Sequence, residues 1–148
     1  MVSSDILPAV RESIYSTIVE TGAAPAAESV AQALKRPAPL VDDAYRELAD
    51  GHVIVLERGA TTIWSAPPFS AVPTPFLVRS GPSSWYAPCA WDAFGIPAAL
   101  HRDARIDARC AWSGDAIPCG VEDGAAYGDG VIHLLVPAAR FWDDIFYT

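Results

Sequence analysis

Apolar residues recur every four positions near the start of the chain, which is the period of an amphipathic helix. These positions are Ile6, Val10, Ile14 and Ile18. Glycine favours the position just after a helix, so we expect this helix to end at Thr21–Gly22. The same period predicts a second helix over about residues 25–34 and a third over residues 39–50.

A β-hairpin is predicted directly after the third helix. Two β-prone runs, at residues 52–56 and 61–64, flank a glycine-containing turn at residues 57–60. Three helices followed by a hairpin is the order of a winged helix, so we predict a winged-helix-like domain over residues 1–66. The third helix of such a domain would contact DNA, yet it carries four carboxylates and the single cation Arg46. Carboxylates repel phosphates, so we expect this region to act as a packing platform.

The rest of the chain predicts a linker and a second domain. Residues 67–75 hold four prolines, which favour an extended linker. Residues 76–148 then mix strand and helix patterns, which makes the fold class α+β. We expect strands at residues 76–78, 105–112 and 117–121, a helix over 88–100, and helical turns after Pro137. The most apolar run, residues 131–136, predicts the strongest strand, and residues 145–148 resemble the beginning of another.

The charge balance narrows the classes of partner. The chain of 148 residues has 10 Lys and Arg against 18 Asp and Glu, a formal net charge of −8, which disfavours nucleic acid and anionic membranes. No apolar run approaches the roughly 18 residues of a membrane helix, and the N-terminus does not resemble a signal peptide. Three cysteines, an odd number, are typical of free thiols in a reducing compartment. We therefore expect a cytoplasmic protein.

Cys89 and Asp92 are the strongest candidates for chemistry. Residues three apart on a helix share a face, so the predicted helix places thiol and carboxylate side by side. The positive end of the helix should lower the pKa of the thiol, while the thiolate and the aromatic neighbours should raise the pKa of the carboxyl. A soft nucleophile beside a proton donor suits attack on a soft electrophile. The spacing alone nevertheless favours a simpler interpretation, a packed cysteine beside a capping or solvated aspartate.

The sequence around this pair resembles the core motif of the alkylmercury lyases. In that family an aromatic-Tyr-Ala stretch precedes a Cys, an Asp follows three residues later, and a Pro-Ala-Leu run comes next, as in residues 85–100 here. Residues 105–114 resemble the next block, a strand that ends in Cys-Ala-x-Ser/Thr-Gly, and residues 131–137 resemble an apolar strand that ends in Pro. The likeness covers about residues 65–140, and the family also has a winged-helix-like region before its catalytic part.

The resemblance implies detoxifying cleavage of a carbon–mercury bond without an organic cofactor. It makes Cys89 a catalytic thiolate that binds mercury, Asp92 the catalytic proton donor, and Cys110 a structural cysteine. The implied partner is a small organometal or a soft metal ion, with mercury as substrate and product rather than as a resident metal. The oligomeric state stays open.

The chain departs from the family pattern at the second mercury-binding Cys, which lies beyond the apolar block in the family. Here the residues up to Thr148 contain no such Cys, so we expect either a shortened chain or a relative without the full site. Cys119 is a candidate substitute ligand, placed opposite Cys110 across a turn at residues 113–116, although a spare half-buried cysteine is the favoured interpretation. Two alternatives to a lyase follow. One is a non-catalytic relative that binds a soft metal or a thiol-reactive ligand through Cys89, with Asp92 as a further candidate metal ligand, and the other is a winged-helix sensor.

Overall fold

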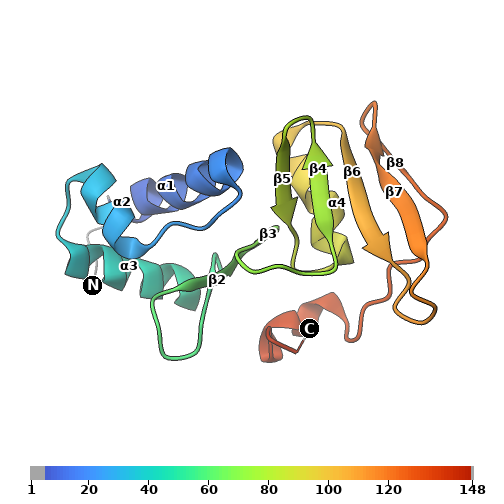
Figure 1. Ribbon diagram of the computed structural model, residues 1–148. Coiled ribbons are helices and arrows are strands. Elements are labelled where there is room, and N and C mark those ends of the chain that lie inside the picture. The colour runs from blue at the N-terminus through green and yellow to red at the C-terminus, as the bar shows by residue number, and fades with distance from the viewer. Residues whose placement is uncertain (1–5, 148) are drawn as a thin grey trace.

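Three helices form one end of the molecule in the computed structural model, which describes residues 6–147 (Figure 1). They are α1 (Ile6–Thr21), α2 (Ala27–Leu34) and α3 (Ala38–Asp50). The predicted apolar stripe of α1 is buried, and Gly22 ends the helix with a φ of +75° and an N–H that donates to Ile18 O at 2.8 Å. In the described part of the chain, no helix is long and apolar enough to cross a bilayer.

The predicted hairpin follows α3 as β1 (Val55–Leu56) and β2 (Ile63–Ala66), which pair antiparallel. The predicted order of three helices and a hairpin is therefore confirmed. On α3, Asp43, Glu47 and Asp50 are exposed, so the acidic character expected of this helix is present at its surface. Membership of the winged-helix class and the lack of DNA binding stay predictions.

The strands within residues 6–147 belong to one antiparallel sheet of eight strands, in the order β1-β2-β3-β5-β4-β6-β7-β8. The remaining strands are β3 (Phe69–Ser70), β4 (Leu77–Ser80), β5 (Ser83–Tyr86), β6 (Ala104–Arg109), β7 (Ala116–Glu122) and β8 (Ala125–Tyr127). The second half of the sheet lies at the opposite end of the molecule from α1–α3, with α4 (Ala90–Leu100) against one of its faces (Figure 1). The α+β fold class is thus confirmed.

The proline-rich segment 67–75 is not a bare linker. Phe69 and Ser70 are buried and form β3, which pairs with β2 on one side and with β5 on the other. Proline cannot donate to a ladder, but the prolines here only flank these two residues, which keep their N–H groups for pairing. One continuous core spans both regions, and Trp85 Nε1 donates to Ile18 O at 3.0 Å across them. The division into two domains stays a prediction.

The prediction of strands at residues 131–136 and 145–148 is wrong for the part that the structure describes. An apolar run becomes a strand only beside a strand edge with free N–H and C=O groups. After β8 pairs with β7, the chain continues along β7, where Gly128 and Gly130 lie against Cys119 and Ile117, and so it does not turn back to the free outer edge of β8. Residues 131–136 therefore run as coil, with Leu135 exposed, and residues 145–147 form a turn. Thr148 lies outside the described residues.

The C-terminal segment returns to the N-terminal hairpin. The predicted helical turns after Pro137 appear as the 3-10 helix η1 (Ala138–Asp143). Trp142 stacks on His52 with ring centroids 4.1 Å apart, and Phe146 meets Trp64 at 5.0 Å. The C-terminal end of the chain consequently lies between the hairpin and the second half of the sheet (Figure 1).

Candidate active site

Cys89 and Asp92 meet at the start of α4 in a reciprocal pair of hydrogen bonds. Cys89 is the N-cap residue, with extended backbone (φ −147°, ψ 175°), and its Sγ accepts the N–H of Asp92 at 3.5 Å. The thiol donates in turn to Asp92 Oδ2 at 3.3 Å. The bond from the Asp92 N–H is one half of a capping box, with a thiol where a hydroxyl is usual, and the Asp92 carboxylate accepts from the thiol rather than from the backbone N–H of the N-cap residue. The helix start itself therefore holds a nucleophile and a proton carrier in contact.

Burial is the largest cause of the pKa shifts of both Cys89 and Asp92. Desolvation raises the pKa of the Cys89 thiol, and the Asp92 carboxylate raises it further, while the amides of Asp92 and Trp91 lower it by a smaller amount. The expected lowering of the Cys89 pKa is therefore wrong, because burial outweighs the helix terminus. Desolvation also raises the pKa of Asp92, in the expected direction, although the hydrogen bond from Cys89 opposes it. Both groups thus favour their protonated forms more than they do in water.

Three elements far apart in the sequence surround this pair. Burial raises the pKa of Tyr15 on α1, and the charge of Asp92 contributes to that shift, so the phenol and the carboxylate lie near one another. The Tyr15 hydroxyl donates to Val53 O at 3.0 Å or to Pro67 O at 3.1 Å. The pair therefore lies where α1, the segment between β2 and β3, and α4 meet.

Gly95 allows α4 to approach that segment closely. A Cβ at Gly95 would lie 3.2 Å from Pro68 Cβ, closer than side chains normally pack. The sequence analysis missed Tyr15 and Pro68. Tyr15 looks like any other residue of an amphipathic helix, and Pro68 looks like any other residue of a proline-rich segment. Gly95, a glycine inside a helical pattern, is the one signal in the sequence that could have indicated this close contact.

The structure does not bring Cys119 to the pair. Cys119 lies on β7 opposite Ile106 rather than opposite Cys110, and its thiol donates weakly to Ile106 O at 3.9 Å. The partner of Cys119 is four residues from the expected one, because the turn closes earlier: Cys110 O accepts the N–H of Gly114, and the Cys110 N–H donates to Asp115 O. Within residues 6–147, no three Cys, His, Asp or Glu side chains form a group that could hold a metal ion.

Cys110 lies just after β6 at the start of this turn and is partly exposed. The backbone amides of Ser113 and Trp112 and the Ser113 side chain lower the pKa of its thiol. The strand predicted over residues 105–112 therefore ends at Arg109, and Cys110 lies in a turn. Its structural role stays a prediction.

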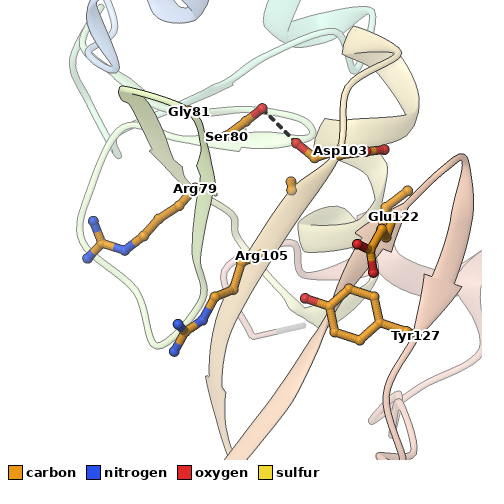
Figure 2. Close-up of a pocket in the computed structure, with 9 residues that line it drawn as sticks. Arg79, Ser80, Gly81, Asp103, Arg105, Glu122 and Tyr127 are labelled. Carbon is orange, nitrogen blue, oxygen red and sulfur yellow. Dashed lines mark hydrogen bonds between the residues drawn. The ribbon is translucent and has the colours of Figure 1, made fainter.

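A charged hollow of about 320 Å³ lies beside the β4–β5 turn (Figure 2). Arg79 and Arg105 extend from neighbouring strands, and both guanidinium groups are paired with Asp107, at 2.8 and 3.4 Å. Ser80 Oγ donates to Asp103 O at 2.7 Å at the same end of the sheet. This hollow holds no thiol, so the chemistry expected from the sequence belongs to the start of α4.

Comparison with known proteins gives the family. The sequence model of the alkylmercury lyases matches residues 69–146, more than half of the chain, and this range includes Cys89 and Asp92. No curated protein matches. The solved structure of the mercury-bound form of MerB2 shares the fold, with a TM-score of 0.65 and 24% identity over 86% of this chain. The chain spans 61% of the length of that relative. From the family match and the shared fold, this chain belongs to the alkylmercury lyase family.

Proposed function

We propose that this chain cleaves the carbon–mercury bond of organomercurials by protonolysis. Cys89 supplies the thiolate that binds mercury, and Asp92 delivers the proton to carbon. The observation that carries the proposal is the 3.3 Å contact between Cys89 Sγ and Asp92 Oδ2 in a half-buried site. Membership of the alkylmercury lyase family supports the substrate class.

In the first step an organomercury cation bonds to Cys89 Sγ and displaces the thiol proton. The nearest acceptor is Asp92 Oδ2, to which that proton already points. Because burial raises the pKa of Asp92, the carboxyl group is suited to hold the proton. Formation of the sulfur–mercury bond therefore transfers the thiol proton to Asp92, which becomes the proton donor.

In the second step the electron pair of the carbon–mercury bond takes the proton from Asp92. The hydrocarbon leaves, mercury(II) remains on Cys89, and Asp92 returns to the carboxylate. Removing the carboxylic proton in a desolvated site is favourable once mercury(II) adds positive charge beside it. No organic cofactor takes part in this sequence, and the mercury is substrate and product.

The second candidate function is binding of the organomercurial or a soft metal ion without turnover. Additional sulfur donors activate soft mercury, and within residues 6–147 no third ligating side chain joins the pair. This observation favours slow cleavage even if the chemistry above is correct. Single-turnover conditions over hours are therefore the proper test.

The experiment follows benzene release from phenylmercury by gas chromatography. The purified chain is compared with Cys89→Ser and Asp92→Asn, and Cys119→Ser is the matched thiol control. We expect Cys89→Ser to lose release entirely. Asp92→Asn should retain phenylmercury, seen by mass spectrometry, but release benzene roughly 10²–10⁴ times more slowly, the usual contribution of a positioned proton donor.

Two results would change the proposal. Phenylmercury located on Cys89 by peptide mass spectrometry, without benzene release, establishes the binding function instead. Equal release rates in Asp92→Asn and the unmodified chain remove Asp92 from the role of proton donor.

A further inference from the structure

A mostly apolar cavity of about 560 Å³ lies between α4, the inner face of β6 and β7, and the coil after β8. Its volume falls within the range of small-molecule sites. Two of the three cysteines of the chain line it, among aromatic and aliphatic side chains. The residues used below are Phe76, Phe94, Cys110, Cys119 and Ile132.

This cavity is separate from the Cys89–Asp92 pair. Ala90 and Phe94, four residues apart, share the face of α4 that lines the cavity, whereas Asp92 and Gly95 lie on a different face. Neither Cys89 nor Asp92 is among the lining residues. Helix α4 therefore stands between the two places.

The coil of residues 128–133, called here the strap, packs against Cys119 and Ile117 of β7. A Cβ at Gly128 would lie 2.7 Å from Cys119 Cβ, and one at Gly130 would lie 3.0 Å from Ile117 Cγ2. Glycine at both points lets the strap lie directly on β7, and it leaves Cys119 only 7% exposed. The strap thus forms a wall of the cavity, with Cys119 behind it.

The mouth of the cavity combines a thiol with exposed apolar side chains. Cys110 is partly exposed, and Trp112 and Val131, which also line the cavity, are 96% and 92% exposed. Because both line the cavity, they continue its apolar surface to the outside. A ligand suited to this place has a thiophilic atom for Cys110 and an apolar group for the walls.

We propose that this cavity is a second binding site for organomercury cations, in which Cys110 bonds the mercury and the apolar walls hold the organic group. The ligand class rests on the proposed function, while the site rests on the cavity and its thiols. The Cys110 thiolate displaces a weaker ligand from mercury, that ligand leaves as an anion, and the thiol proton passes to solvent.

Any exposed thiol binds an organomercurial, so the test is competition with a small thiol. Cys89→Ser is loaded with one equivalent of phenylmercury in excess glutathione, and the retained fraction is measured by native mass spectrometry. We expect retention, and retention of phenylmercury roughly tenfold or more above that of methylmercury, because the walls bury the larger group. The double variant Cys89→Ser/Cys110→Ser should lose both organomercurials to glutathione.

Two matched variants in the C-terminal coil distinguish the contribution of the cavity walls to phenylmercury retention from that of the Cys110 thiol alone. Ile132 lines the cavity and is 36% exposed, and its neighbour Leu134 is 37% exposed but does not line it. In the Cys89→Ser background, Ile132→Ser should lower phenylmercury retention about threefold or more, and Leu134→Ser should not. Alkylation of Cys110 by iodoacetamide should be equal in both variants, which shows that the thiol itself is unchanged.

The proposal is overturned if phenylmercury and methylmercury exchange equally with glutathione, or if Ile132→Ser and Leu134→Ser behave alike. These readouts are taken in a chain without the Cys89 thiol, whereas the proposed function is read from benzene release by the unmodified chain. Failure of one is therefore distinguishable from failure of the other.

Discussion

Replacing Gly128 by alanine tests whether the strap presses on Cys119. Gly128 has a φ of +134°, a conformation that side chains rarely adopt. The added Cβ would lie 2.7 Å from Cys119 Cβ and 3.2 Å from Pro118 O. Carbon atoms pack at about 3.5–4.0 Å, so the strap and β7 must separate by roughly 1 Å.

The cost has two sources. Backbone strain at this φ contributes about 1–3 kcal/mol, and overpacking against β7 contributes a similar amount. We therefore expect the free energy of unfolding to fall by about 2–4 kcal/mol. Gly124→Ala is the matched control, because Gly124 also has a positive φ, +74°, but a Cβ there meets nothing within 4 Å. This control should lose only about 1 kcal/mol, from backbone strain alone.

Urea unfolding followed by tryptophan fluorescence measures both losses. Alkylation of the folded chain by N-ethylmaleimide, resolved by peptide mass spectrometry, reports on the cover over Cys119. We expect Gly128→Ala to lift the strap and to speed alkylation of Cys119, and Gly124→Ala to leave it slow. If both variants unfold at the same urea concentration and protect Cys119 equally, the strap does not lie on Cys119 and the reasoning fails.

Three further predictions follow from the contacts and charges described above. Burial raises the pKa of Cys89, whereas backbone amides lower the pKa of Cys110, so iodoacetamide should alkylate Cys110 first near neutral pH. Mass spectrometry over a pH series measures the two rates, and faster alkylation of Cys89 would contradict this prediction. Burial raises the pKa of Asp92, so its protonated form stabilises the fold at low pH and this stabilisation is lost as pH rises through the folded-state pKa. Asp92→Asn should consequently increase the free energy of unfolding near pH 7 but not at about pH 3, and equal urea curves at both pH values would refute the shift. Trp142→Ala removes the stack on His52 and should cost about 0.5–1.5 kcal/mol, with faster hydrogen exchange in η1, whereas unchanged exchange would show that the stack does not hold the C-terminal segment.

The local features of this protein could be predicted from its sequence. Helices α1 to α3 follow from apolar spacing and from glycine and proline at their ends, because helix hydrogen bonds join residues only four apart. The contact between Cys89 and Asp92 follows for the same reason, since residues three apart at a helix start meet whatever surrounds them. The family motif is local as well.

Features that depend on distant residues could not be predicted in this way. The sequence predicts a lowered pKa for Cys89, but the pKa is raised, because burial by other parts of the chain exceeds the local effect of the helix. The predicted partner of Cys119, Cys110, is four residues from the observed partner, Ile106. The hydrogen bonds of the turn at Gly114 set the pairing of β6 with β7.

The apolar run 131–136 shows the limit most clearly. Its composition is that of a buried strand, but strand formation needs a partner edge, and after β8 the chain continues along β7 instead of turning back to the free edge of β8. The strap that precedes and overlaps this run instead closes a thiol-lined cavity. The sequence by itself determined the helices and the paired thiol and carboxylate, because those interactions lie within one helical turn. The tertiary structure alone decided strand partners, burial and the cavity, because these depend on which distant segments compete for the same edge or face.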